Sequence, residues 1–187
     1  MARRAVPYFN RSWDHFCSHQ HTPDDPDAPE VTPGALVNAS RGIAYFAHPI
    51  FTRYREYGQP LYRDLVKDAL AALLPEPAFT VGLPSQGRAA LTHQPEPGRH
   101  VLHLLYATPV KRGAAQSQWG SGTQSVEVIE DLVPLHDIAC AVRVPGPVSA
   151  VTLEPQNEPL PFTQDGNVVR FTVPHLFCHQ MVTIKAG

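Results

Sequence analysis

The chain has 187 residues, a formal net charge of −2 from 15 Lys+Arg and 17 Asp+Glu, and a hydrophobic fraction of 43%. That hydrophobic fraction is typical of globular domains and excludes a fully disordered chain, and the lack of a basic excess argues against a nucleic-acid partner. No apolar run approaches the roughly 18 residues that span a bilayer, and Arg3-Arg4 is not followed by the apolar stretch of a signal peptide. We therefore expect a cytoplasmic protein with no membrane partner.

Proline is the compositional outlier, with 20 residues in the chain, about twice the usual share near 5%. Because proline interrupts helix interiors and central strands, the composition predicts short elements joined by many turns. The pattern changes near residues 75–77, where two prolines flank Glu76. Mixed helix and strand signals precede this point, and strand and turn signals follow it.

The first part contains one predicted strand and one predicted helix. The short apolar run at residues 42–47 predicts a buried strand. Residues 60–74 predict a helix, because their apolar positions follow one face of a 3.6-residue period. Pro60 suits the first helical turn, and Pro75 ends the helix. The apolar positions are Leu61, Leu65, Val66, Ala69, Leu70, Leu73 and Leu74.

The second part contains short predicted strands at even spacing. The turn sequence Gln164-Asp165-Gly166-Asn167 predicts a hairpin, because Asp-Gly supplies the positive φ angles of such turns. Short strands with this punctuation are typical of an antiparallel β-sandwich. The predicted strands are residues 101–106, 126–130, 138–144, 149–153, 168–173 and 181–184.

The densest group of functional side chains lies at residues 13–22, where His15, Cys17, His19 and His21 are all competent metal ligands. Side chains two apart on a strand share a face, so Cys17, His19 and His21 could converge on a metal, with Asp14 as the near fourth ligand. The alternative is a polar loop whose imidazoles hydrogen-bond to backbone or ligand. The three cysteines form no CxxC pair, which argues against a disulfide framework and excludes a Cys-rich zinc site.

Other catalytic patterns have little support. The carboxylate groups Asp24/Asp25, Glu127/Glu130/Asp131 and Glu154/Glu158 are interpreted as solvated side chains rather than as a glycosidase pair. Cys17 follows Phe16 and is interpreted as a partly buried structural cysteine. No Gly-rich phosphate loop is present. We predict no catalytic residue and no cofactor.

Several stretches resemble large bacterial glycoside hydrolases, similar to family forty-two β-galactosidases and the related α-L-fucosidases. They are VPYFNRSWDHFCSHQHTP at 6–23, AHPIF at 47–51, YGQPLYRDL at 57–65, LHLLYATP at 102–109, QWG at 118–120, VIED at 128–131, VPHL at 173–176 and HQMV at 179–182. The resemblance covers nearly all of this chain but only the C-terminal part of such an enzyme, because the catalytic barrel and its carboxylates have no counterpart here.

The resemblance implies an α+β fold in which a partial α/β segment precedes an antiparallel β-sandwich. Residues 1–76 correspond to the C-terminal part of a glutamine-amidotransferase-like trimerisation domain, and residues 77–187 to the terminal sandwich. By this resemblance the chain begins inside the α/β domain. Missing strands would leave an open sheet edge and an apolar face, so we expect the isolated chain to self-associate.

The resulting hypothesis is a non-catalytic C-terminal portion of a glycoside hydrolase that supports oligomerisation and the active-site rim. Trp13, His15, His19 and His21 would line that rim, because imidazole and indole groups suit sugars. The expected partner is a second copy of this chain or a barrel-bearing glycoside hydrolase chain. Carbohydrate is a further candidate ligand. The alternatives are a free-standing carbohydrate-binding or interaction module and a small metal-dependent enzyme built on the histidine cluster.

Overall fold

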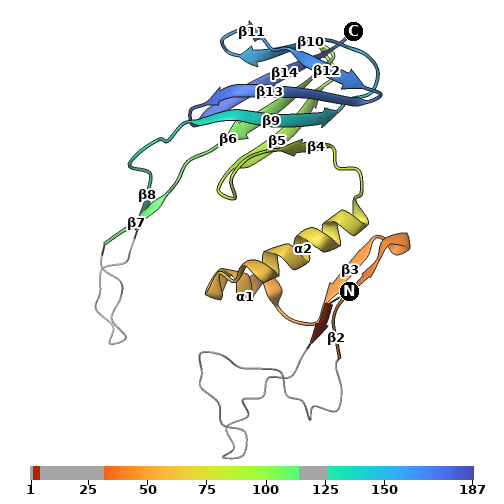
Figure 1. The fold of residues 1–187 in the computed structure, drawn as a ribbon, viewed down its shortest axis with the longest axis vertical. Helices are drawn as coiled ribbons and strands as arrows, with labels where there is room; N and C mark the ends of the chain where they lie inside the picture. The colour runs from red at the N-terminus through yellow and green to blue at the C-terminus, as the bar shows by residue number, and fades with distance from the viewer. Residues whose placement is uncertain (1, 5–31, 114–125) are drawn as a thin grey trace, which may run out of the picture. The chain divides into compact units, whose positions relative to one another are not determined.

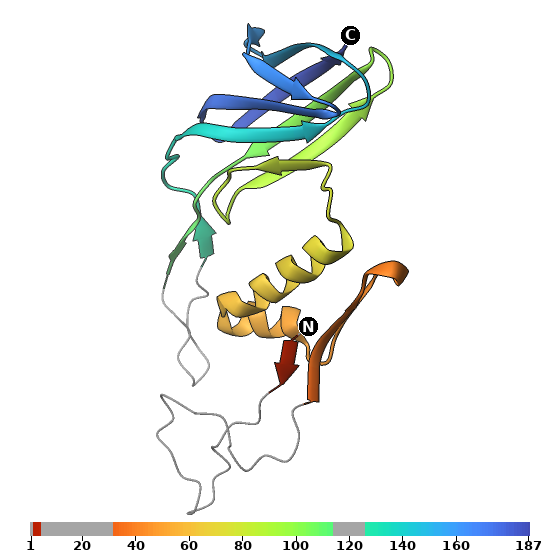
Figure 2. The same cartoon turned by 45° about the vertical axis from the view of Figure 1, so that its right-hand side comes forward.

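The computed structural model describes residues 2–4, 32–113 and 126–187 of the chain (Figure 1). It divides into two compact units, Met1–Glu76 and Pro77–Gly187. Figures 1 and 2 show a small sheet with helices in the first unit and packed sheets in the second. The structure is thus α+β with a β-sandwich, which confirms the fold class expected from the sequence.

The sheet of the first unit has the order β1-β2-β3, formed by β1 (Ala2–Arg4), β2 (Thr32–Asn38) and β3 (Ile43–Phe46). Its strands pair antiparallel. A 3₁₀ turn, Ala39–Arg41, joins β2 to β3, and the Asn38 side chain caps it by accepting a hydrogen bond from the Arg41 backbone at 3.1 Å. Gly42 then takes a φ of +65°, a conformation that glycine adopts without strain.

Strand β3 confirms the strand expected at residues 42–47, but the expectation that it is buried was wrong. Ile43 and Tyr45 are 55% and 61% exposed. They lie on one face of the hairpin together with Leu36, the cross-strand partner of Tyr45. Successive side chains of a strand point to opposite faces, and in this antiparallel hairpin only the other face is covered.

The first unit has two helices, α1 (Ile50–Tyr57) and α2 (Pro60–Leu73). Helix α2 confirms the prediction, with Pro60 in its first turn and its end just before Pro75. It packs against β2 and β3. Helix α1 was not predicted, because its eight residues are too short for a clear periodic pattern. Gly58 ends it with a φ of +63° and donates its backbone N–H to the Tyr54 carbonyl at 2.8 Å.

The second unit contains a sandwich of two antiparallel sheets. The five-stranded sheet has the order β11-β10-β14-β6-β5, and the four-stranded sheet has the order β12-β13-β9-β4. The strands of the first are β5 (Arg88–Gln94), β6 (Arg99–Leu105), β10 (Val148–Glu154), β11 (Glu158–Pro159) and β14 (His179–Ala186). Those of the second are β4 (Phe79–Val81), β9 (Leu135–Arg143), β12 (Phe162–Asp165) and β13 (Val168–Leu176).

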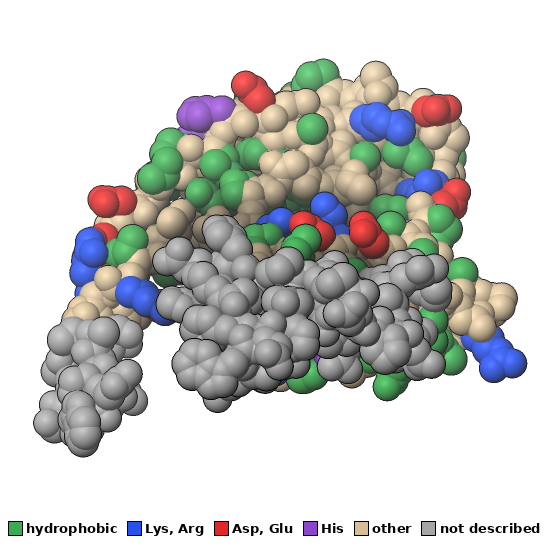
Figure 3. All heavy atoms as spheres, turned by 60° about the horizontal axis from the view of Figure 1, so that its bottom comes forward, with side chains coloured by type: hydrophobic (Ala, Val, Ile, Leu, Met, Phe, Trp, Pro, Cys, Tyr) green, Lys and Arg blue, Asp and Glu red, His purple; other side chains and the backbone are tan. Residues whose placement is uncertain are grey.

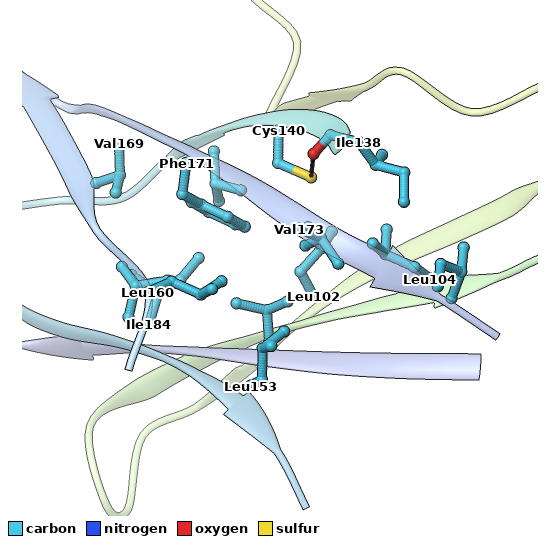
Figure 4. Close-up of a cluster of buried hydrophobic side chains, with 14 of the residues drawn as sticks. Leu102, Leu104, Ile138, Cys140, Leu153, Leu160, Val169, Phe171, Val173 and Ile184 are labelled. Atoms are coloured by element: carbon cyan, nitrogen blue, oxygen red, sulfur yellow. Dashed lines mark hydrogen bonds between the residues drawn. The ribbon is translucent and has the colours of Figure 1, made fainter. Parts of the chain in front are cut away.

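The core lies between the two sheets and follows from period-two alternation along each strand. In the four-stranded sheet it contains Ile138, Cys140 and Val142 of β9 and Val169, Phe171 and Val173 of β13 (Figure 4). The five-stranded sheet contributes Leu102, Leu104, Val182 and Ile184, all 0% exposed. The alternation explains why the sequence signal for these strands was strong.

Five of the six predicted strands belong to the sandwich, as β6, β9, β10, β13 and β14. The predicted hairpin at residues 164–167 is also present, since Asp165 pairs with Val168 and Gly166 takes a φ of +57°. The sixth predicted strand is β8 (Val126–Val128), which pairs with β7 (Val110–Arg112) in a separate two-stranded sheet. Among the described residues, no helix is long and apolar enough to cross a membrane.

Candidate functional site

The histidine-rich cluster falls in residues 5–31, outside the part of the chain that the structure describes. This applies to the expected rim residues and to the metal alternative alike. Both therefore stay predictions. The residues concerned are Trp13, Asp14, His15, Cys17, His19 and His21, and Asp24 and Asp25 lie in the same segment.

Two of the remaining carboxylates have defined partners. Glu130 forms an ion pair with Arg112, whose Nε donates to Glu130 Oε1 at 2.7 Å and whose Nη2 donates to Oε2. The hydrogen bond from Arg112 to Glu130 raises the pKa of the guanidinium, although partial desolvation opposes it. Glu154 Oε1 accepts a bond from the Thr183 hydroxyl at 3.4 Å. These contacts give both carboxylates structural roles on the second unit.

Cys140 is an unreactive thiol by its surroundings. It is 4% exposed within the sandwich core, and its Sγ donates to the Ile138 carbonyl at 3.6 Å. Burial raises its pKa to about 12, because the thiolate would be desolvated. A nucleophilic cysteine needs the opposite, a lowered pKa and access to substrate. Cys178 is half-buried, and it forms no disulfide with Cys140, the other cysteine in the described part of the chain.

The outer face of the four-stranded sheet contains a hollow of about 530 Å³. One row of cross-strand partners crosses its floor: Thr163 of β12, Arg170 of β13, Ala141 of β9 and Thr80 of β4. These side chains alternate with core residues, so they all point away from the core. A second hollow of about 180 Å³ shares Thr80, Ala141 and Arg170 with the first and continues toward Arg143.

The hollow exists because its floor is built from small side chains. Ala139 and Ala141 flank Cys140 on β9, and the threonines at its borders are short. Its polar groups are the hydroxyls of Thr80, Thr163 and Thr172 and the guanidinium of Arg170. The aromatic residues in its lining, Phe162 and Phe171, pack into the core. The described lining thus offers hydrogen bonds and one positive charge, but no carboxylate pair for glycoside hydrolysis.

The first unit has an apolar groove of about 270 Å³ between its two helices. Its lining includes Phe51 and Tyr54 of α1 and Val66 and Leu70 of α2. Phe51 is 69% exposed and Leu70 is 50% exposed. Phe51 and Leu70 are therefore large apolar side chains at the surface. Figure 3 shows hydrophobic side chains, in green, lying among charged ones on one face of the protein. A contiguous exposed apolar surface of this kind is typical of a protein–protein contact.

Neither the hollow nor the groove was predicted from the sequence. The signal for the hollow was present in Ile138-Ala139-Cys140-Ala141-Val142, where alternate residues are small. It predicted a strand but gave no indication that the alanine face would be concave. For the groove, the signal was the wide apolar face of α2. In the part of the chain that the structure describes, no group of three or more His, Cys, Asp or Glu side chains could hold a metal ion.

Comparison with known proteins finds similarity among the solved structures. No protein-family model matches the chain, and no curated protein matches its sequence. Among solved structures, the chain is similar to α-L-fucosidase isoenzyme 2 from Paenibacillus thiaminolyticus, with 38% sequence identity and a TM-score of 0.83. The match covers 99% of this chain and 26% of the fucosidase, so the chain spans about a quarter of that enzyme's length.

This match supports the resemblance to part of a glycoside hydrolase that the sequence predicted. The amidotransferase-like and trimerisation character of residues 1–76 stays a prediction.

Proposed function

We propose that this chain is a non-catalytic C-terminal portion of a glycoside hydrolase of the α-L-fucosidase type, which supports the assembly of the enzyme and the rim of its active site. The observation on which the proposal depends is the asymmetry of the structural match, which takes in 99% of this chain but 26% of the fucosidase. A region that matches only a quarter of an enzyme at 38% identity is expected to act together with the remainder.

The chemistry of the described residues supports a non-catalytic role. Glycoside hydrolysis requires two carboxyl groups about 5 to 10 Å apart across the scissile bond. Glu130 is held by Arg112, and the lining of the hollow contributes hydroxyls and Arg170 instead of a carboxylate pair. The described surfaces are therefore suited to contact and support rather than to bond cleavage.

The partner we propose is a barrel-bearing region of a glycoside hydrolase. The groove between α1 and α2 offers it an almost wholly apolar surface, with Phe51 and Leu70 accessible. Burial of such side chains against a partner stabilises a complex by about 25 cal/mol for each Å² removed from water. Without that partner the same surface favours self-association of the isolated chain, which sedimentation at micromolar concentration would detect as an oligomer.

Grafting tests the proposal directly. The matching quarter of the Paenibacillus fucosidase is replaced by this chain, and the chimera is compared with a fucosidase that lacks the quarter and with this chain alone. Hydrolysis of a p-nitrophenyl α-L-fucoside is the readout. We expect the chimera to be active and the chain alone to be inactive. Hydrolysis by the chain alone would overturn the proposal, as would a folded chimera no more active than the deletion protein.

A matched pair of substitutions in the chimera tests the groove. Phe51 lies in the groove and is 69% exposed, whereas Phe177 lies in the second unit and is 53% exposed. We expect Phe51→Ser to lower the activity or the thermal stability of the chimera, because it removes apolar contact with the barrel region. Phe177→Ser removes a similar exposed ring outside the groove and is expected to have little effect. Equal effects of the two substitutions would contradict a docking role for the groove.

The histidine-rich segment supports a second part of the proposal, in which Trp13, His15, His19 and His21 line the rim of the active site. Alanine substitutions at these positions in the chimera are expected to change KM or kcat, because these side chains suit contact with sugar. Unchanged KM and kcat in all four variants would remove the rim role while leaving the assembly role standing.

A further inference from the structure

Two histidines of the sandwich bring their ring nitrogens together on one face of the five-stranded sheet. His103 lies on β6 and His179 on the neighbouring strand β14. In the register, His103 is opposite Met181 and His179 is opposite Leu105, so the two histidines are diagonal neighbours. His103 Nδ1 and His179 Nε2 are 3.4 Å apart, and the ring planes differ by 14°.

From this geometry we propose that His103 and His179 form a binding site for a divalent transition-metal ion such as Zn²⁺ or Ni²⁺. Zinc–imidazole bonds are about 2.0 to 2.1 Å long, and a tetrahedral angle between two of them places their nitrogens about 3.3 to 3.4 Å apart. The pair is therefore already at the nitrogen–nitrogen spacing that one tetrahedral ion requires. Rotation of the rings about their side-chain torsions would turn both lone pairs toward a common point.

The proton balance of binding is simple. In the neutral hydrogen-bonded pair, one ring donates an N–H to the unprotonated nitrogen of the other. When the ion binds, the donor ring moves its proton to its other nitrogen through solvent, and both facing nitrogens become ligands. Acid weakens binding, because protonated imidazoles cannot ligate a metal.

Solvent access and nearby charge are compatible with an ion. His179 is exposed and His103 is half-buried, so hydrated metal can reach both rings. The row of cross-strand partners through His103 includes Ala90, whose small side chain leaves room, and ends at the carboxylate of Glu154. The row through His179 ends at Arg88, whose guanidinium is turned to the carbonyls of residues 85–87. One row thus ends in the negative charge of Glu154 and the other in the positive charge of Arg88, and these two charges offset one another.

The site has two protein ligands in the described part of the chain, since no third His, Cys, Asp or Glu completes a cluster there. Water molecules would fill the remaining coordination positions of the ion. In such a site the water ligands can exchange. A structural zinc site with four protein ligands, by contrast, is closed. It is independent of the proposed assembly function, and the histidine cluster at residues 15–21 is not part of it.

A second histidine pair provides the control. His136 and His175 are direct cross-strand partners on β9 and β13, with ring centroids 5.2 Å apart and planes tilted by 49°. Their rings are closer by centroid than those of His103 and His179, which are 5.7 Å apart. Yet within the described residues only His103 and His179 form a ring-nitrogen contact of hydrogen-bonding length. The two pairs thus have similar distances between their imidazole rings, but only His103 and His179 have the nitrogen–nitrogen spacing that a metal ion requires.

The test is a titration of the full chain with zinc chloride, followed by calorimetry and by the ring ¹⁵N signals of the histidines. The background protein has His15→Gln, Cys17→Ser, His19→Gln and His21→Gln, so that the candidate metal ligands of the histidine-rich segment do not contribute. We expect the ring signals of His103 and His179 to shift together. His103→Gln and His179→Gln are each expected to weaken zinc binding about 10²-fold, because the second imidazole binds intramolecularly. His136→Gln is expected to leave the affinity unchanged.

Equal zinc affinity in the His103→Gln protein and its parent would overturn the proposal, as would unshifted ring signals of both histidines. If a variant fails to fold, the ring ¹⁵N signals of His103 and His179 in the parent protein, followed during the zinc titration, still test the proposal. Copper and ascorbate oxidise histidines that bind the metal, and peptide mass spectrometry locates the added oxygen. Oxidation concentrated at His103 and His179 is expected, whereas equal oxidation at His136 and His175 would contradict the site.

Discussion

Gln156 and Gln180 form a reciprocal pair of side-chain amide hydrogen bonds. Gln156 Nε2 donates to Gln180 Oε1 at 3.1 Å, and Gln180 Nε2 donates to Gln156 Oε1 at 3.0 Å. The same Gln180 nitrogen also lies within bonding distance of the Glu154 and Met181 carbonyls, at 2.8 and 2.9 Å. Gln180 is 6% exposed, so this network fastens the turn after β10 to the start of β14 from inside the sandwich.

Gln180→Leu tests that network. The substitution roughly keeps the volume but removes the Gln180 amide that donates to the Glu154 and Met181 carbonyls and to Gln156, and lost hydrogen bonds of buried polar groups are costly. We expect the free energy of unfolding to fall by about 1 to 3 kcal/mol. Urea unfolding followed by circular dichroism measures it. Gln156→Ala is the control, because Gln180 then keeps its backbone partners, and a loss as large as that of Gln180→Leu would contradict this account.

Cys140 and Cys178 are expected to differ in reactivity. Because burial raises the pKa of Cys140 to about 12, its thiol is protonated and shielded at neutral pH. We expect iodoacetamide to modify Cys178 in the native protein and Cys140 only in urea, as located by peptide mass spectrometry. Native modification of Cys140 at the rate of Cys178 would mean that the core is open.

The same thiol predicts a loss of stability at alkaline pH. Its pKa in the folded protein is about 12, against an ordinary value of 9.0. Between these values the unfolded chain releases the proton and the folded chain does not, so unfolding becomes more favourable as pH rises. Cys140→Val should remove this contribution. The check is the urea midpoint at pH 8 and at pH 10 for both proteins, and equal declines in the two would refute it.

His100 predicts a contribution of the opposite sign. Burial, and secondarily the charge of neighbouring His93, lowers the pKa of His100 below 6.5. As pH falls below about 6.5, the unfolded chain binds the proton first, so this contribution to stability is lost toward acid. His100→Gln is expected to flatten the decline of the urea midpoint between pH 7.5 and 5.5. An unchanged decline in that variant would show that other groups cause it.

Core and surface leucines of one strand provide a packing test. Leu102 is 0% exposed within the core, whereas Leu105 of the same strand is 45% exposed. Leu102→Ala is expected to cost about 2 to 5 kcal/mol of unfolding free energy, through lost burial and the cavity left behind. Leu105→Ala should cost about 0.5 kcal/mol. Thermal or urea unfolding of both variants measures the contrast, and similar costs would contradict the assigned core.

Sequence patterns predicted the elements whose burial is regular. Buried side chains alternate with more exposed ones over residues 138–143 of β9 and 168–174 of β13, and α2 has a periodic apolar face with Pro60 and Pro75 at its ends, so all three were found. Strands such as β5 were missed because Arg88-Ala89-Ala90-Leu91 has few β-branched residues. Its strand conformation is imposed by pairing with β6, a contact distant from any local signal.

The surfaces were harder to predict than the elements. Whether the apolar face of α2 is buried depends on what packs against it, and Leu61 and Leu70 are exposed although the periodicity places them on the apolar face. The His103–His179 contact depends on the register of β6 with β14, which joins residues far apart in sequence. Local spacing does not determine such a register.

The position of β14 has a consequence for biosynthesis. It is the last strand of the sandwich in the chain, yet it lies at the centre of the five-stranded sheet, between β10 and β6. While the ribosome is still making residues 179–186, the strand pairs β5–β6 and β10–β11 have no neighbour to join them. The five-stranded sheet is therefore complete only when its final strand has been translated, and until then the apolar inner faces of the sandwich are exposed to aggregation.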